Sequence, residues 1–157
     1  MDTLNGFEKH NLKHTSASQI NMYSNCAGAW CARYLYGRKF TFGNAARAGV
    51  LAEYAVQAVL VGSLSRDDAV YQALDSYRCA TALTGTDADK KRGEAIEGMI
   101  DNALEVLLPL GKPDFTDVSS FNGQKEILLN CKGDGWELPI KGYLDFVYPQ
   151  HSKSIDL

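Results

Sequence analysis

The sequence predicts a mixed α+β domain, α/β in the broad sense, in which helices come first and strands follow. Apolar residues recur at helical spacing up to Leu108, and after Pro113 they alternate with polar residues. With 157 residues, of which 45% are hydrophobic, the chain is long enough to bury a core. We therefore expect N-terminal helices packed on an antiparallel β-meander, in a single domain that covers residues 1–157.

The first expected helix begins at Ser16. Ser16 and Gln19 have the spacing of a capping box, in which the hydroxyl and the amide satisfy free backbone donors at a helix start. Gly37 is expected to end the segment. Residues at helical spacing between these ends are Ile20, Tyr23, Ala27, Trp30, Cys31 and Tyr34.

Three further helices are expected before the strands. The second covers residues 44–60, and the third follows the cap signal Ser65-x-x-Asp68. The fourth covers residues 87–108 and is stopped by Pro109 and Gly111. Apolar residues expected to face inward on the second and fourth helices are Leu51, Ala55, Ala58, Val59, Ile96, Met99, Ile100, Ala103, Leu104 and Leu107.

The period-two region predicts three strands. The first covers residues 124–131 and is followed by a turn at Asp134-Gly135. The second covers residues 136–148 with a bend at Pro139, and the third begins at Ser154.

The last two strands are expected to form a hairpin with a four-residue loop, Pro149–Ser152. In that register Tyr148 faces Lys153, and Asp145 faces Asp156. Like charges placed directly opposite each other repel, unless one carboxylate is protonated or a cation lies between them. Two converging carboxylates suit Mg²⁺ or Mn²⁺. The alternative is a one-residue shift in register, which would turn one aspartate to the other face of the sheet.

These two strands also carry a family resemblance. Gly-Tyr-Leu-Asp-Phe-Val at 142–147 and Ile-Asp-Leu at 155–157 resemble the active-site hairpin of the PD-(D/E)XK nucleases, in the branch of RecB, AddB and the CRISPR-adaptation exonucleases. In that family the second strand continues with Lys-Thr. The resemblance therefore implies a domain that is incomplete at its C-terminus, truncated before the catalytic lysine.

Three other segments resemble the same family in the same order. Residues 15–26 resemble its opening helix, and residues 124–127 resemble its first core strand. Residues 47–53 resemble a Gly-x-x-x-His helix that supplies a metal ligand, with Glu53 in place of the histidine. Together these segments imply a restriction-endonuclease-like core over roughly residues 14–157, without the helix and strand that complete it in the family.

The resemblance implies a metal-dependent nuclease that hydrolyses DNA phosphodiester bonds, as an exonuclease in repair, recombination or phage DNA processing. Asp145, Asp156 and Glu53 would be the catalytic and metal-binding residues, the main-chain carbonyl of Leu157 a further ligand, and Mg²⁺ or Mn²⁺ the cofactor. DNA and a helicase or recombination protein are the expected partners. Without the lysine, the 157 residues by themselves are expected to be inactive. Two alternatives remain open. One is a catalytically inactive nuclease-like module that binds nucleic acid or acts as a scaffold, and the other is a small metal-stabilised domain without a nucleic-acid partner.

The charge balance argues against a generic nucleic-acid coat protein but permits a local basic strip. The formal net charge is −3, whereas such coats are basic. The alternative for the strip is an ordinary solvated helix end. The candidate nucleic-acid-binding residues are Arg33, Arg38, Lys39 and Arg47, interleaved with Tyr34, Tyr36, Phe40 and Phe42.

The four cysteines do not have the spacing of a zinc ribbon, because no CxxC is present. Cys31 and Cys131 are expected to be buried thiols. Cys26 matches the first cluster cysteine of the iron–sulfur members of the family. The other three ligands in those members follow the nuclease motifs, so an iron–sulfur cluster is the less favoured alternative.

No apolar run approaches the length needed to cross a bilayer, and the N-terminus lacks a signal-peptide pattern. We therefore expect no membrane partner and a cytoplasmic protein.

Overall fold

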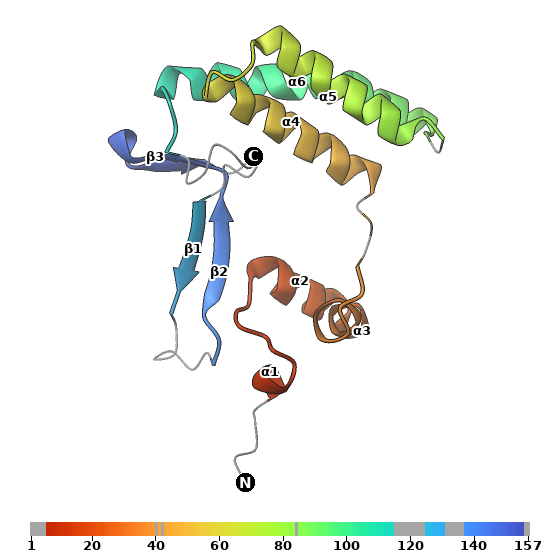
Figure 1. Ribbon diagram of the computed structural model, residues 1–157, viewed down its shortest axis with the longest axis vertical. Helices are drawn as coiled ribbons and strands as arrows, with labels where there is room; N and C mark the ends of the chain where they lie inside the picture. Colours follow the sequence, from red (N-terminus) through yellow and green to blue (C-terminus); the bar gives the residue numbers. More distant parts are fainter. Residues whose placement is uncertain are drawn as a thin grey trace. The chain divides into compact units, whose positions relative to one another are not determined.

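The computed structural model has a mixed α+β fold, with helices in the first two-thirds of the chain and short strands near its end (Figure 1). This confirms the expected class and the order of elements. The chain divides into two compact units, residues 1–41 with 126–143 and residues 42–125 with 144–157. The structure describes residues 6–39, 41, 43–83, 85–114, 125–130 and 137–155.

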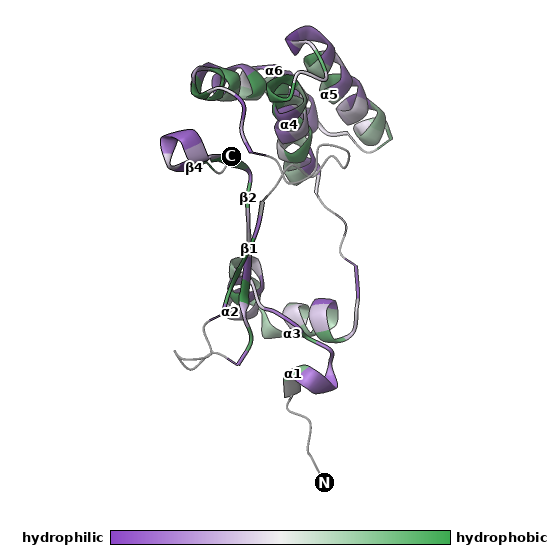
Figure 2. Ribbon diagram, turned by 60° about the vertical axis from the view of Figure 1, so that its left-hand side comes forward, coloured by the Kyte–Doolittle hydropathy of each residue, from purple (hydrophilic) through white to green (hydrophobic). Residues whose placement is uncertain are grey.

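Three helices, α4 (Asn44–Leu60), α5 (Arg66–Thr81) and α6 (Asp87–Leu107), pack against one another in the second unit. The hydropathy colouring in Figure 2 shows apolar and polar sides on these helices, as expected for amphipathic segments that share a core. The buried residues of this core are Ala48, Ala52, Ala55, Val56, Leu60, Ala69, Val70, Ala73, Tyr77, Ile96, Ile100, Leu104, Leu107, Phe146 and Tyr148.

The starts of α5 and α6 are set by side-chain caps. The Ser65 hydroxyl accepts a hydrogen bond from the Asp68 N–H at 3.2 Å, as its position in the sequence predicts. At α6, Thr86 and Asp89 form a full capping box. α6 ends in a 3₁₀ turn that Gly111 stops, with a φ of +81° that favours glycine.

The inward face of α6 is predicted correctly except at Met99. Ile96, Ile100, Leu104 and Leu107 are buried, and Ala103 packs against the core. Met99 remains 43% exposed, because it lies at the rim of the stripe that these four residues form.

Strands β3 (Phe146–Tyr148) and β4 (Lys153–Ile155) form the predicted antiparallel hairpin. Phe146 pairs with Ile155, and Tyr148 pairs with Lys153, as expected. The loop of 149–152 is a 3₁₀ turn that ends at Ser152 with a φ of +51°. Phe146 and Tyr148 are fully buried, so one face of β3 belongs to the core of the second unit.

The first unit contains short helices, α1 (Gly6–Lys9), α2 (Ala17–Asn25) and α3 (Ala27–Trp30), followed by a π-helical turn, η1 (Cys31–Leu35). The expectation of one continuous helix up to Gly37 was wrong. The backbone is extended at Cys26, with φ −159° and ψ 96°, and its thiol caps α3 by accepting a hydrogen bond from the Ala29 N–H. Gly37 ends the segment as predicted, with a φ of +64°.

The strands β1 (Lys125–Leu129) and β2 (Ile140–Leu144) pair with each other in an antiparallel sheet (Figure 1). The single meander expected from the sequence is wrong in this respect, because the long strand divides at Asp145 into β2 and β3. The two strand pairs therefore form separate sheets among the described residues. The predicted turn at 134–135 lies outside the described residues.

Pro139 lies just before β2 rather than within a strand. Its carbonyl accepts a hydrogen bond from the Thr15 N–H at 2.9 Å, and Thr15 forms an isolated parallel bridge with Ile140. The strand thus starts after the proline, which has no N–H to donate to a ladder.

The cysteines differ in exposure. Cys31 is half-buried rather than fully buried, Cys26 and Cys79 are exposed, and Cys131 lies outside the described residues. No helix in the described part of the chain combines the length and the apolarity that a bilayer crossing requires.

Candidate metal and nucleic-acid site

Asp145 lies at the bend where β2 ends and β3 begins. It is 6% exposed and is followed by Phe146, which is fully buried. A carboxylate removed from water in this way needs hydrogen bonds or a cation to offset the lost solvation. Asp145 is therefore a buried carboxylate at the junction of two strands rather than a solvated turn residue.

The hairpin register bears on the predicted pair of aspartates. The three described residue pairs between β3 and β4 have the predicted register. In that register, Asp145 was expected to face Asp156. Asp156 and Leu157 themselves lie outside the described residues, so their predicted roles remain predictions.

Glu53 lines a groove of the second unit together with Ile155, the last described residue of β4. The groove has a volume of about 600 Å³, and Glu53 is half-buried in its wall. Apolar side chains make up most of the lining. The remaining lining residues are Gly49, Val50, Ala52, Val56, Met99, Asn102, Ala103, Val106 and Leu107.

Gln57 orients the Glu53 side chain from one helical turn further along α4. The Gln57 Nε2 donates a hydrogen bond to the Glu53 Oε1 at 2.9 Å, and Gln57 is only 6% exposed. The sequence interpretation did not give Gln57 this role, although the spacing of four residues was a signal for it. Gly49, one turn before Glu53, has open space at the position of a Cβ, so the space beside the carboxylate does not depend on a glycine there.

The donor chemistry of these residues fits a hard divalent cation. Carboxylate oxygens are the ligands that Mg²⁺ and Mn²⁺ prefer. Among the described residues, which do not include Asp156, no three His, Cys, Asp or Glu side chains come together closely enough to hold a metal ion. The candidate site therefore depends on Asp156 joining Asp145 and Glu53.

Three of the four candidate nucleic-acid-binding residues belong to the first unit. Arg33 is half-buried, with its guanidinium carbon 5.5 Å from the centroid of the Tyr34 ring. Arg38 and Lys39 are exposed just after the π-helical turn. Arg47 is half-buried on α4 and belongs to the second unit. Phe40 and Phe42, which were expected to interleave with these cations, lie outside the described residues.

Glu126, on β1, is engaged by a cation. It forms an ion pair with Lys141 on β2 at 2.5 Å, and this contact lowers the pKa of Glu126 and raises the pKa of Lys141. The Lys141 Nζ also lies 5.1 Å from the centroid of the Tyr143 ring. These contacts indicate a structural role for Glu126 across the β1–β2 pair.

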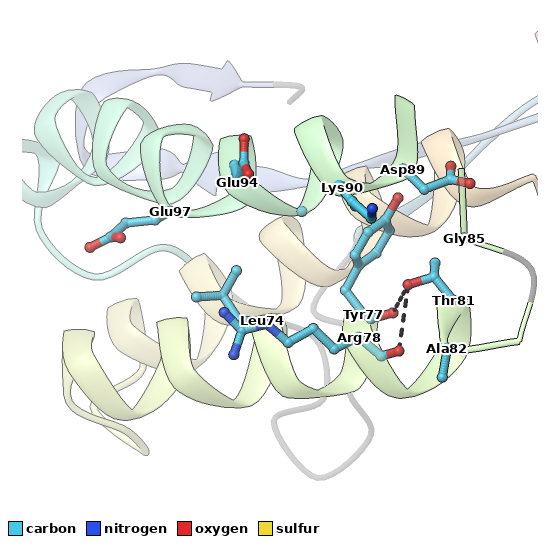
Figure 3. Close-up of a pocket in the computed structure, with 11 residues that line it drawn as sticks. Leu74, Tyr77, Arg78, Thr81, Ala82, Gly85, Asp89, Lys90, Glu94 and Glu97 are labelled. Atoms are coloured by element: carbon cyan, nitrogen blue, oxygen red, sulfur yellow. Dashed lines mark hydrogen bonds between the residues drawn. The ribbon is translucent and has the colours of Figure 1, made fainter. Parts of the chain in front are cut away.

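A second hollow, of about 610 Å³, lies between α5 and α6 (Figure 3). Its charges are mixed, with Arg78 and Lys90 opposed by Asp89, Glu94 and Glu97. None of the described residues predicted for the site lines it. Asp89 is held by the cap of α6 and by Arg92, at 2.8 Å, which indicates a structural role for this carboxylate.

Comparison of the chain with models of known protein families, with functionally described proteins and with solved structures finds no match. The site is therefore interpreted from its own residues: a buried aspartate at a strand junction, a glutamate held by a glutamine, and a basic N-terminal segment.

Proposed function

We propose that the chain is a metal-dependent deoxyribonuclease domain of the PD-(D/E)XK type. In this proposal Asp145, Asp156 and Glu53 hold Mg²⁺ or Mn²⁺, and DNA is the substrate. The observation that carries the proposal is the hairpin of β3 and β4, whose register agrees with a facing pair of Asp145 and Asp156. A restriction-endonuclease-like core is part of the proposal.

The groove bears on the choice of Glu53 as the third ligand. Glu53 and Ile155 line the same hollow, and Ile155 directly precedes Asp156 in the chain. Side chains of neighbouring strand residues point to opposite faces, and Asp145 is not among the described residues that line the groove, so a cation shared by all three carboxylates is part of the proposal. Three carboxylates that approach one another without a cation would repel, so metal binding would stabilise the fold.

Each residue has a defined task in this proposal. The bound metal would lower the pKa of a water molecule and neutralise charge on the scissile phosphate. Asp145 would hold its carboxylate fixed at the strand junction, since its neighbour Phe146 is locked in the core. Gln57 would keep the Oε1 atom of Glu53 oriented through its 2.9 Å hydrogen bond. The exposed Arg38 and Lys39 would attract the phosphate backbone.

Metal binding is the first test, measured as the shift in melting temperature of the 157-residue chain on adding Mn²⁺ or Mg²⁺. At a metal concentration about a hundred times Kd, we expect the wild type to gain about 5–10 °C. Asp145→Asn and Glu53→Ala should gain much less, because each removes a ligand. Asp75→Asn, on the exposed side of α5, is the matched control and should respond as the wild type does. Equal gains in all four proteins would contradict the shared site.

Cleavage of labelled DNA is the second readout of the same site. The 157 residues by themselves are expected to cleave poorly, and addition of Lys-Thr after Leu157 should increase Mg²⁺-dependent cleavage. Asp156→Ala should abolish that increase. Strong cleavage by the 157-residue chain, unaffected by Asp156→Ala, would contradict the assignment. Metal and DNA binding without cleavage in either protein would instead favour an inactive nuclease-like binding module.

A further inference from the structure

A ladder of aromatic rings runs along the helices of the first unit. The ring centroids of Tyr23 and Trp30 lie 5.5 Å apart, nearly perpendicular, and those of Trp30 and Tyr34 lie 5.7 Å apart. Tyr36 follows directly after the π-helical turn. We call Tyr23, Trp30, Tyr34 and Tyr36 the aromatic platform.

The platform is accessible to a ligand. Tyr36 is 74% exposed and Tyr23 is 56% exposed, while Trp30 and Tyr34 are half-buried. Within the described residues of the first unit, no apolar side chain is fully buried. The rings therefore do not form the interior of a closed core. The rings of Tyr23 and Tyr36 are largely in contact with water, whereas Trp30 and Tyr34 pack on each other and are partly covered.

The aromatic platform lies in the part of the sequence that has an excess of basic residues. Residues 1–39 carry five Lys and Arg against two Asp and Glu, whereas residues 40–157 carry eleven against seventeen. Residues 1–39 therefore carry a net positive charge, although the whole chain has a net charge of −3. Arg33 lies over the Tyr34 ring, and Arg38 and Lys39 follow Tyr36 in the chain. The platform thus combines π-faces with cations that complement a phosphate backbone.

The local backbone is also irregular at this place. In η1 the Tyr36 N–H donates to the Cys31 carbonyl at 3.1 Å, a π-type bond over five residues. Such turns are rare and are found frequently at functional sites. The helical backbone that carries the platform is interrupted at Cys26 and changes to a π-helical turn at Cys31. Tyr23 therefore lies on α2, Trp30 on α3 and Tyr34 on η1.

We propose that the aromatic platform binds single-stranded nucleic acid, by stacking unpaired bases on its rings while the nearby cations contact the phosphates. Bases in a duplex are already stacked on one another and offer no free π-face, whereas those of a single strand do. Stacking on the platform therefore favours a single strand over a duplex. It names the form of the substrate and rests on the proposed nuclease function for the cleavage step only, since binding requires neither metal nor Asp145.

The test is fluorescence anisotropy of a labelled oligothymidylate of about 16 nucleotides, titrated with the full chain in EDTA at low salt. A duplex of the same length is the competitor. We expect the single strand to bind more tightly than the duplex, and Tyr36→Ala to weaken single-strand binding about fivefold or more. Tyr36→Trp should retain binding.

The matched control is Tyr71→Ala. Tyr71 is 70% exposed on α5, in the second unit. The substitution therefore removes a ring of similar exposure from outside the platform, and it should leave binding unchanged. Replacing both Arg38 and Lys39 with Gln should weaken binding and reduce its dependence on salt. Because Tyr36 and Tyr71 are largely exposed, neither substitution should alter the circular dichroism spectrum.

Several outcomes would overturn the proposal. These are equal affinity for duplex and single strand, binding of neither, or equal effects of Tyr36→Ala and Tyr71→Ala. Self-association in sedimentation that Tyr36→Ala removes, without single-strand binding, would assign the platform to a protein contact instead. Asp145→Asn separates the two proposals: if it retains single-strand binding while the wild type shows no metal response, the nuclease function fails and the platform stands.

Discussion

At the scale of single residues, Asp89 shows how a cap fixes a charge. Its Oδ2 atom accepts hydrogen bonds from the Thr86 N–H and the Thr86 hydroxyl, both at 2.9 Å, and Arg92 contacts its Oδ1 atom. These bonds favour the ionised form, and the Thr86 backbone bond contributes most. They lower the pKa of Asp89 from 3.8 to about 2.

This lowered pKa predicts a pH-dependent stability. A carboxylate whose pKa is lower in the folded than in the unfolded state stabilises the fold above pH 3.8, and the contribution is lost as the pH falls towards about 2. Asp89→Asn should therefore melt at a lower temperature than the wild type at pH 7, and the gap should close between about pH 4 and pH 2. Thermal melts across this range measure it.

The control for this prediction is Asp87→Asn in the same turn, because the Asp87 side chain is 95% exposed. Its effect on the melting temperature should be much smaller at every pH. A gap between Asp89→Asn and the wild type that stays constant down to pH 2 would contradict the assigned role of the cap.

At the scale of elements, two glycines of α6 differ in their surroundings. A Cβ on Gly93 would lie 3.2 Å from the Tyr77 ring, which is 2% exposed, whereas a Cβ on Gly98 would meet nothing within 4 Å. Alanine in an open helical position gains about 0.5–1 kcal/mol over glycine. We therefore expect Gly98→Ala to stabilise the protein by about that amount.

Gly93→Ala should be less stable than Gly98→Ala by about 1–2 kcal/mol, since overpacking against a buried ring offsets the helical gain. Urea unfolding followed by circular dichroism measures both free energies. Equal values for the two variants would show that Tyr77 shifts freely into the adjoining hollow.

The helices of the second unit were predictable because their ends carry local signals. Ser65 precedes α5 as a cap, α4 covers the expected residues 44–60, and Gly111 follows the end of α6. The β3–β4 register was predictable for a similar reason, since a four-residue loop fixes which residues face each other.

The interruptions of the first helix at Cys26 and of the long strand at Asp145 were not predictable from the same signals. Cys26 interrupts the first helix and caps the next with its thiol, but a thiol is a weak acceptor and is not among the preferred cap types. Asp145 interrupts a strand whose apolar alternation continues on both sides of it, so the pattern alone gives no boundary. In the candidate site, the groove shared by Glu53 and Ile155 depends on tertiary packing, which no local spacing specifies.

At the scale of the whole molecule, the buried apolar side chains of the described residues all belong to the second unit. They include Val56, Ile96 and Ile100, each at most 1% exposed. Among the described residues, the first unit contributes only the polar Gln19 to the buried set. Local stability follows buried apolar contacts, so the two units should open with different free energies.

Native-state hydrogen exchange tests this difference. We expect the central amides of α4 and α6 to exchange more slowly than those of α2 and α3, by at least on the order of tenfold. Addition of the oligothymidylate should slow exchange in α2 and α3 selectively if the platform binds it. Equal protection of both sets of helices without ligand would show that the first unit is stabilised by contacts other than buried apolar ones.

The division of the long strand at Asp145 separates the register of the first sheet from that of the hairpin. β2 takes its register from β1, β3 takes its register from β4, and Asp145 lies between the two strands. A one-residue slip in a continuous strand would invert every side chain along it. Here a one-residue shift between β1 and β2 would change the backbone at the bend and leave the register of the β3–β4 hairpin unchanged. Insertions or substitutions in the first sheet could therefore accumulate without disturbing the alignment of the residues that follow Asp145.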